Sequence, residues 1–213
     1  MEQIPDLLAR VAALMSDFEP EWALCGGWSV DAWLGRRTRD HCDVDLTIFQ
    51  DDQQAMFDYL TDGWLLNGHD DDDPDGTEPW SGRRLGFPSH IHAYFGETFN
   101  LDIQLNRRDA GDWVFSTRAG IRLPVDRCHA TSAWGIPTLA PEAVLFYKAI
   151  GVIRPHDETD FHTLAPTLTD DQRSWLSAAL ASLRPEHEWL PALQSRVVGG
   201  SSRQRDESDI QTS

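Results

Sequence analysis

The stretch that decides the fold runs over residues 25–48 and reads CGGWSVDAWLGRRTRDHCDVDLTI. In it a glycine pair, Gly26-Gly27, follows a short apolar run, and an Asp-hydrophobic-Asp pair opens the final segment, DVDLTI. Apolar and polar residues alternate along that segment, which is the period of a β-strand. Asp43 and Asp45 therefore point from one face, with α-carbons roughly 6–7 Å apart. Two carboxylates at this spacing can converge on one or two divalent ions, the usual partners of phosphates in transfer chemistry.

The alternative is that both aspartates are solvated surface residues, because carboxylates are usually exposed. Aspartate is disfavoured in strands, however, and two on one face repel each other. The upstream glycine pair is a second feature, since glycines let a backbone approach a triphosphate closely. The helix that follows presents free N–H groups to anionic oxygens. The combination favours a metal and phosphate site.

Composition and charge narrow the classes of function. The 213 residues, of mass 24.1 kDa and 40% hydrophobic, fit one sizeable domain or a domain with a small helical partner. The sequence has no run of about 18 apolar residues and begins with no signal peptide, so we expect a cytoplasmic protein without a membrane partner. The net charge of −17 argues against a nucleic-acid partner and is compatible with a cationic small molecule.

Hydrophobic periodicity predicts an α+β fold, in which a mixed set of strands comes first and helices follow. Glycines, prolines and an acidic run predict a long loop over 67–89 and a hairpin over 113–124. We expect helices at 3–17, 28–34, 52–61, 141–151, 157–165 and 170–183, and strands at 22–25, 43–49, 64–66, 90–95 and 99–105.

The apolar run, Gly26-Gly27, the short helix and the Asp43-Val44-Asp45 strand resemble the nucleotidyltransferase superfamily, which has the polymerase-β-like fold. Fifteen residues separate the glycine pair from the aspartate pair. This register is similar to that of the small aminoglycoside and lincosamide nucleotidyltransferases. The resemblance is specific over about 26–48 and loose beyond it. It implies a mixed sheet with flanking helices. The expected divisions are a nucleotidyltransferase domain over 1–130, a helical C-terminal region over 131–198 and a disordered tail over 199–213.

The resemblance also implies a reaction. A nucleoside monophosphate, AMP from ATP or another NTP, passes to a hydroxyl of a small molecule such as an aminoglycoside- or lincosamide-like antibiotic. Asp43 and Asp45 are expected to hold two Mg²⁺ ions. Asp102, on the polar face of an alternating strand, is the third acidic residue, and it either completes the second metal site or takes the proton of the acceptor hydroxyl. The sequence leaves both roles open.

Four further residues are expected to bind the nucleotide. Gly26 and Gly27 would face the phosphates, and Arg39 would contact them through its planar donors. Lys148 is the only lysine of the chain and would neutralise a triphosphate oxygen. Downstream, Asp157 is predicted to cap a helix, and Asp160 to hold Lys148 in place.

Other readings of the sequence stay open. His90 and His92 share one strand face and could bind a metal, but no cysteine or carboxylate stands at motif spacing, which favours a half-exposed strand. Trp28 and His41 are predicted to be structural. The alternative functions are adenylylation of a protein, as in toxin–antitoxin nucleotidyltransferases, and a catalytically idle nucleotide-binding module. An idle protein is expected to have lost a carboxylate, and this chain keeps all three.

Overall fold

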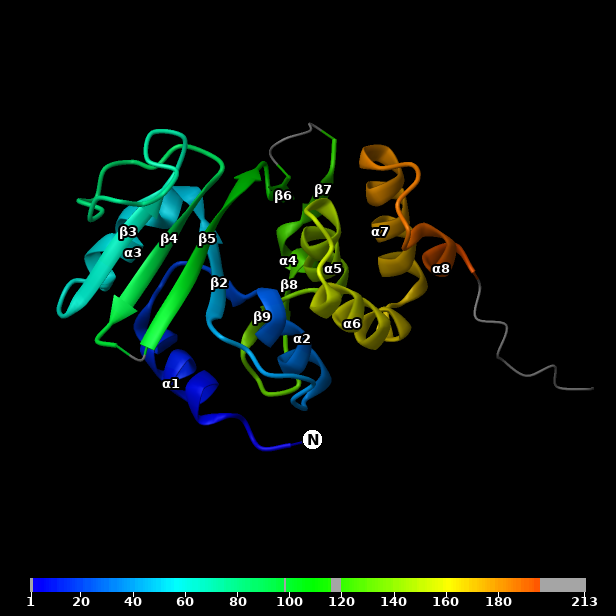
Figure 1. Ribbon diagram of the computed structural model, residues 1–213, viewed down its shortest axis with the longest axis horizontal. Helices are drawn as coiled ribbons and strands as arrows, with labels where there is room; N and C mark the ends of the chain where they lie inside the picture. The colour runs from blue at the N-terminus through cyan, green and yellow to red at the C-terminus, as the bar shows by residue number, and fades with distance from the viewer. Residues whose placement is uncertain (1, 98, 116–119, 196–213) are drawn as a thin grey trace, which may run out of the picture.

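A mixed β-sheet runs through the molecule with helices packed against it, as Figure 1 shows. The computed structural model describes residues 2–97, 99–115 and 120–195. Within them the strands follow the order β3-β4-β5-β2-β1-β9-β8, and β6 pairs with β5 and β7. The α+β class predicted from the sequence is confirmed.

The strands are β1 (Trp22–Leu24), β2 (Val44–Phe49), β3 (Trp64–His69), β4 (Ser89–Phe95), β5 (Phe99–Asp109), β6 (Asp112–Val114), β7 (Arg122–Pro124), β8 (His129–Thr131) and β9 (Pro137–Leu139). The α-helices are α1 (Asp6–Leu14), α2 (Gly26–Leu34), α3 (Gln53–Tyr59), α4 (Val125–Cys128), α5 (Pro141–Ile150), α6 (Pro155–Leu164), α7 (Asp170–Leu183) and α8 (Leu190–Gln194).

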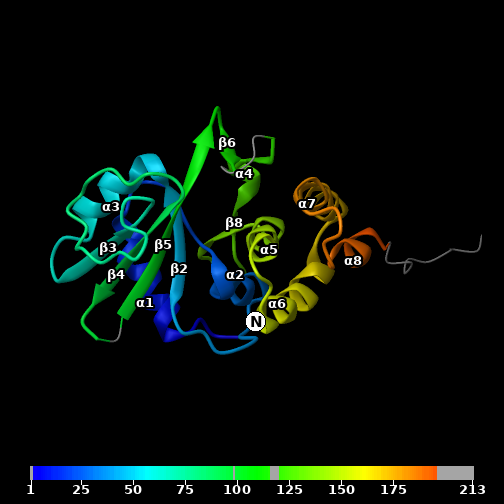
Figure 2. The ribbon, with the colours of Figure 1, turned by 45° about the horizontal axis from the view of Figure 1, so that its top comes forward.

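The sheet separates two hydrophobic clusters, because alternate strand residues point to opposite faces. On one face Leu24 and Ile48 pack in a cluster that includes residues of α1 and α3. On the other face Ala23 and Phe49 pack in a cluster that includes residues of α5, α6, α7 and α8. The rotated view in Figure 2 shows the two groups of helices on either side of β2 and β5. The central strands are thereby buried on both faces.

The centre of the sheet carries the pairing that matters for function. β2 and β5 run parallel, and β1 lies antiparallel on the other side of β2. β9 then adds to β1 in parallel. The predicted division at residue 130 falls inside β8, and β9 lies wholly beyond it, so the sheet continues into the segment that was expected to be helical.

Several predicted boundaries differ from the structure. The expected loop over 67–89 is wrong in its first three residues, because β3 continues to His69 while it pairs with β4. The helix predicted at 28–34 begins at Gly26, and the one predicted at 157–165 begins at Pro155. The predicted tail over 199–213 lies outside the described residues.

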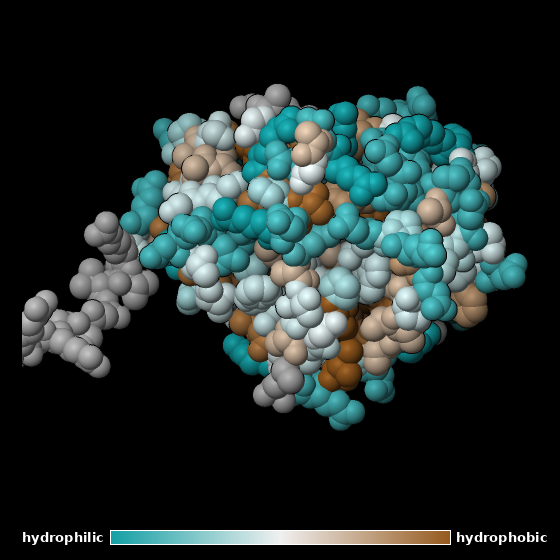
Figure 3. Space-filling model, turned by 180° about the vertical axis from the view of Figure 1, so that it is seen from behind, coloured by the Kyte–Doolittle hydropathy of each residue, from teal (hydrophilic) through white to brown (hydrophobic). Residues whose placement is uncertain are grey.

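The surface of the molecule is shown by residue hydropathy in Figure 3. The face in Figure 3 is mostly hydrophilic, with small, separate hydrophobic areas. No helix within the described residues combines the length and the apolar character needed to cross a bilayer.

Gly35 follows the last residue of α2, and its backbone conformation is what ends the helix. It adopts φ +65°, a left-handed conformation that glycine reaches without a Cβ penalty. We expect Gly35→Ala to lower the free energy of unfolding by about 1 kcal/mol. Gly151→Ala is the matched control, because Gly151 follows α5 with φ −88° and open space around its α-carbon. Chemical denaturation compares the two, and an equal effect of both changes would contradict the assignment.

Candidate active site

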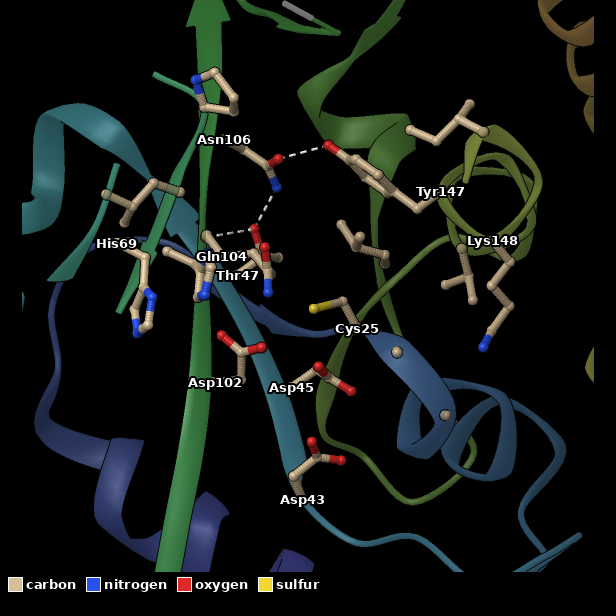
Figure 4. Close-up of a pocket in the computed structure, with 18 of the residues that line it drawn as sticks. Cys25, Asp43, Asp45, Thr47, His69, Asp102, Gln104, Asn106, Tyr147 and Lys148 are labelled. Atoms are coloured by element: carbon tan, nitrogen blue, oxygen red, sulfur yellow. Dashed lines mark hydrogen bonds between the residues drawn. The ribbon is translucent and has the colours of Figure 1, made fainter. Parts of the chain in front are cut away.

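Three carboxylates meet where β2 and β5 run side by side. The parallel register places Asp45 of β2 directly opposite Asp102 of β5, and Asp43 immediately precedes β2. Figure 4 shows the three side chains directed toward a common space. Adjacent strands lie only about 4.8 Å apart, so the register forces like charges together.

The carboxylates are electrostatically strained. Burial, reinforced by the charge of Asp43, raises the pKa of Asp45 to about 6. Burial, reinforced by Asp45 and Asp43, raises the pKa of Asp102 to about 7. In the part of the chain that the structure describes, no arginine or lysine forms an ion pair with any of the three. One carboxylate oxygen of Asp102, Oδ1, is buried without a hydrogen-bond partner. This set of hard oxygen donors fits a divalent cation such as Mg²⁺.

The glycine pair begins α2 directly beside these carboxylates. Gly26 adopts φ +60°, and a Cβ at this position would overlap the carboxylate of Asp45. A Cβ at Gly27 would overlap the side chains of Arg39 and His41. The two glycines therefore allow charged side chains to approach the N-terminus of a helix, where free N–H groups favour anions.

A cationic cluster stands on the other wall of the site. Lys148 of α5 donates to Asp157 at 3.2 Å and lies 2.7 Å from Asp160, and both carboxylates are buried. Arg39 donates to the two oxygens of Asp160 at 3.2 and 3.1 Å. Arg154 donates to Asp157 at 3.0 Å. We call Arg39, Lys148 and Arg154, held by the two aspartates of α6, the cationic cluster.

Of the two predictions made for the aspartates of α6, the structure confirms one and corrects the other. Asp160 does hold Lys148, as predicted. Asp157 does not cap α6 as its N-terminal residue, because the helix begins at Pro155 and Arg154 occupies the capping position. The carboxylate of Asp157 instead lies in the first turn and accepts from the backbone N–H of Arg154 at 3.0 Å. Its negative charge suits the positive end of the helix dipole.

One cleft joins the carboxylates and the cationic cluster. Its volume is about 1130 Å³, which exceeds the usual size of a single small-molecule pocket. The structure brings every predicted site residue to its lining: Gly26, Gly27, Arg39, Asp43, Asp45, Asp102 and Lys148. Their roles stay predictions. Sequence reasoning did not single out Arg154 or His69, which also line the cleft.

The predicted acidic loop forms one rim of the cleft, to which Asp70 and Asp71 contribute. Asp70 is buried and has a structural task. It accepts from both terminal nitrogens of Arg83, at 2.7 and 2.8 Å, and from the backbone N–H groups of three loop residues. The hydrogen bond from Arg83 holds the pKa of Asp70 well below its usual range. Asp71 is exposed and leaves a negative charge on this rim.

A chain of hydrogen bonds ties the sheet to α5, and Figure 4 shows it above the carboxylates. Asn106 donates to Thr47, and Thr47 donates to the carbonyl of Gln104. Tyr147 of α5 donates to Asn106 and accepts from Trp113. Tyr147 immediately precedes Lys148, so this chain fixes the position of the helix that carries the lysine.

Two residues have the structural roles predicted for them. His41 contacts the buried carboxylate of Asp31 at 2.7 Å. Trp28 is 3% exposed and packs against the ring of His41, with ring centroids 4.3 Å apart. Trp28 belongs to α2 itself, whereas His41 also lines the cleft and lies against Gly27.

The fold, with a glycine pair at a helix N-terminus and carboxylates on neighbouring strands, is similar to that of solved adenylyltransferases. Residues 7–68 match the family described as aminoglycoside-2''-adenylyltransferase. The match spans β1, α2, β2 and β3, and so includes the glycine and aspartate pairs. No curated protein matches the sequence of this chain.

Solved antibiotic adenylyltransferases share the fold. The lincosamide antibiotic adenylyltransferase LnuA, with lincomycin bound, has a TM-score of 0.56 at 21% identity, covering 78% of this chain and 100% of its own. The solution structure of the antibiotic-resistance factor ANT(2'')-Ia has a TM-score of 0.57 at 18% identity, covering 87% and 94%. The complex of ANT(2'')-Ia with adenylyl-2''-tobramycin has a TM-score of 0.55 at 18% identity, covering 83% and 97%. These findings confirm the resemblance predicted from the sequence.

Repulsion among the carboxylates predicts an effect on stability. In chelator at neutral pH, Asp102→Asn should raise the free energy of unfolding by about 1–2 kcal/mol, because it removes a buried charge placed in register with Asp45. Asp58→Asn is the control, since Asp58 is exposed on α3, and it should change stability by less than about 0.5 kcal/mol. A thermal or urea melt measures both. Destabilisation by Asp102→Asn would show that its carboxylate is not strained.

Proposed function

We propose that this protein is a metal-dependent nucleotidyltransferase that moves a nucleoside monophosphate, AMP from ATP or another NTP, to a hydroxyl of a small molecule. One observation carries the proposal. A single cleft has three mutually repelling carboxylates on one wall and the cationic cluster on the other. Buried aspartates hold the cations of that cluster in place. A triphosphate with its metal ions carries the opposite charge pattern, so it fits between the two walls.

The carboxylates are the residues that would hold magnesium. Asp43 and Asp45 are assigned as ligands of two ions, and Asp102 touches the second site. The unpartnered oxygen of Asp102 and the raised pKa values of Asp45 and Asp102 support the assignment of a cation site to these side chains. Magnesium bound here would offset charge on the triphosphate and help align it for substitution.

The chain's own residues would bind and orient the nucleotide. The N–H groups at Gly26 and Gly27 are suited to phosphate oxygens, because helix N-termini attract anions. Lys148 would neutralise a further phosphate oxygen. Its two buried aspartates hold the ammonium in place, so little side-chain freedom is lost on binding. Arg39 is fixed in the same way by Asp160 and adds a second cation.

The proposed step is an in-line substitution at phosphorus. The acceptor oxygen forms a bond to the α-phosphorus while the bond from that phosphorus to the bridging oxygen breaks, and pyrophosphate leaves with the bonding electrons. The hydroxyl proton passes to the carboxylate of Asp102. This assignment rests on position, because Asp102 lies on β5, beyond Asp45 of β2 as seen from Lys148 in Figure 4. A base on that side faces away from the leaving group.

The acceptor is proposed to be a cationic, antibiotic-like molecule with hydroxyl groups. The structural neighbours were solved with lincomycin and with an adenylylated tobramycin. In this chain Asp40 and Asp71 are exposed on the cleft lining and would attract a cationic acceptor. The cleft is large enough for a nucleotide and an acceptor together. No observation favours protein adenylylation or an idle module over this reaction.

The test is product formation. Purified protein with Mg²⁺, each of the four NTPs and a panel of aminoglycosides and lincosamides is analysed by mass spectrometry for an added nucleoside monophosphate. Asp43→Asn and Asp45→Asn should lower kcat at least about 1,000-fold, because each removes a proposed metal ligand. Asp58→Asn should leave kcat unchanged. Full activity of either site variant would sink the metal assignment, and a modified protein with no modified small molecule would favour protein adenylylation.

Lys148 gives a separate prediction. Lys148→Met should weaken NTP binding or turnover by about 10–100-fold, since it removes the proposed phosphate contact. It should also lower stability by about 1–3 kcal/mol, because Asp157 and Asp160 lose a buried partner. Lys148→Arg restores the charge and should recover most of the stability. Isothermal titration with a non-hydrolysable NTP separates the effects, and unchanged affinity and turnover in the folded Met variant would leave Lys148 a purely structural residue.

A further inference from the structure

Three histidines meet at the edge of the cleft, on β3 and β4. The antiparallel register places His69 directly opposite His90, and His92 follows two residues later on the same face. One ligand nitrogen from each ring lies within 4.8 Å of the other two. Figure 4 shows His69 on the far side of Asp102 from Asp45. We call His69, His90 and His92 the histidine triad. Sequence reasoning noticed two of its members and placed the third in a loop.

The hydrogen bond of His69 leaves one ring nitrogen available as a metal ligand. Its Nδ1 lies 3.2 Å from the carbonyl oxygen of Pro74. A carbonyl oxygen can only accept, so Nδ1 carries the proton and Nε2 has a free lone pair. That Nε2 is buried and has no hydrogen-bond partner in the described structure. A backbone carbonyl that fixes one ring nitrogen while the other is left free is the usual second contact of a metal-bound histidine.

The surroundings also favour the neutral form of His90 and His92. Burial, together with the neighbouring rings, lowers the pKa of His90 to about 4, and burial lowers the pKa of His92 below its ordinary value. Neutral imidazole is the form that binds metals. The ring centroids of the three pairs lie 4.3 to 4.9 Å apart, so a positive charge on any ring would meet two close neighbours.

We propose that the histidine triad binds one divalent transition-metal ion of the Zn²⁺ class, at a site separate from the carboxylates. Imidazole nitrogen suits zinc, cobalt, nickel and copper, whereas Mg²⁺ prefers the oxygens of Asp43 and Asp45. Three protein ligands leave a fourth position open, as in zinc sites that bind a substrate or water. His69 and His90 line the cleft, so a ligand in the cleft can reach that position.

Binding requires a small rearrangement of the rings. Metal–nitrogen distances near 2.1 Å place the nitrogens of a tetrahedral site about 3.4 Å apart, and the three nitrogens here lie within 4.8 Å of one another. His69 and His90 are stacked with only 8° between their planes, so one ring must turn before both lone pairs meet one ion. The site also adjoins the proposed catalytic carboxylates, because Nε2 of His92 lies 3.7 Å from Oδ2 of Asp102.

The test uses the full chain after removal of metals with a chelator. Isothermal titration with Zn²⁺ should give one ion per chain, and Co²⁺ should give the intense visible absorption of a low-coordinate site with nitrogen ligands. His69→Ala and His90→Ala should each weaken Zn²⁺ binding at least about tenfold, which is 1.4 kcal/mol or more. His162→Ala is the matched control, since His162 is exposed on α6, and it should bind as the wild-type chain does.

The Asp43→Asn/Asp45→Asn double variant separates this proposal from the proposed function. It should lose nucleotide transfer and keep its affinity for Zn²⁺, because the triad is intact. Circular dichroism confirms folding of each variant, and His90→Gln replaces His90→Ala if the latter does not fold. No saturable Zn²⁺ binding to the wild-type chain would overturn the proposal. Equal binding in folded triad variants, or loss of Zn²⁺ only in the aspartate variant, would overturn it as well.

Discussion

The parallel pairing of β2 with β5 is the constraint on which the rest of the site depends. It sets Asp45 and Asp102 side by side in a partly buried sheet, where their charges repel and no lysine or arginine of the described chain forms an ion pair with them. A fold keeps such a pair at a cost in stability. A bound metal ion attracts both carboxylates and offsets their mutual repulsion, so the cost in stability is consistent with a role in holding cations.

On the second wall of the cleft the charges are paired, unlike the carboxylates of the first wall. The cations of the second wall are fully paired, because Asp157 and Asp160 of α6 hold Arg39, Lys148 and Arg154. This pairing makes the C-terminal helices part of the site, although they contribute no proposed metal ligand. It also connects the loop before β2 with α5 and α6, because Arg39 and Lys148 share Asp160. Nucleotide binding and the packing of the helices therefore depend on the same contacts.

Local patterns predicted much of this structure. Alternation along DVDLTI identified β2, and the helix predicted over 28–34 ends where α2 does, because both signals depend on neighbours in sequence. Short motifs of the same kind predicted the site residues that line the cleft, and their roles stay predictions. Pairing between distant strands could not be predicted. His69 stands opposite His90 only because β3 extends beyond its apolar residues, and the addition of β9 to β1 depends on contacts more than 100 residues apart.

The most direct measurement is a crystal structure of the protein with Mg²⁺ and an ATP analogue that cannot be cleaved between the α- and β-phosphorus. The account predicts metal ions bound by Asp43 and Asp45, with the triphosphate lying between them, the start of α2 and Lys148. A nucleotide bound away from this cleft would contradict it. So would a triphosphate in the cleft with no metal ion at the two aspartates.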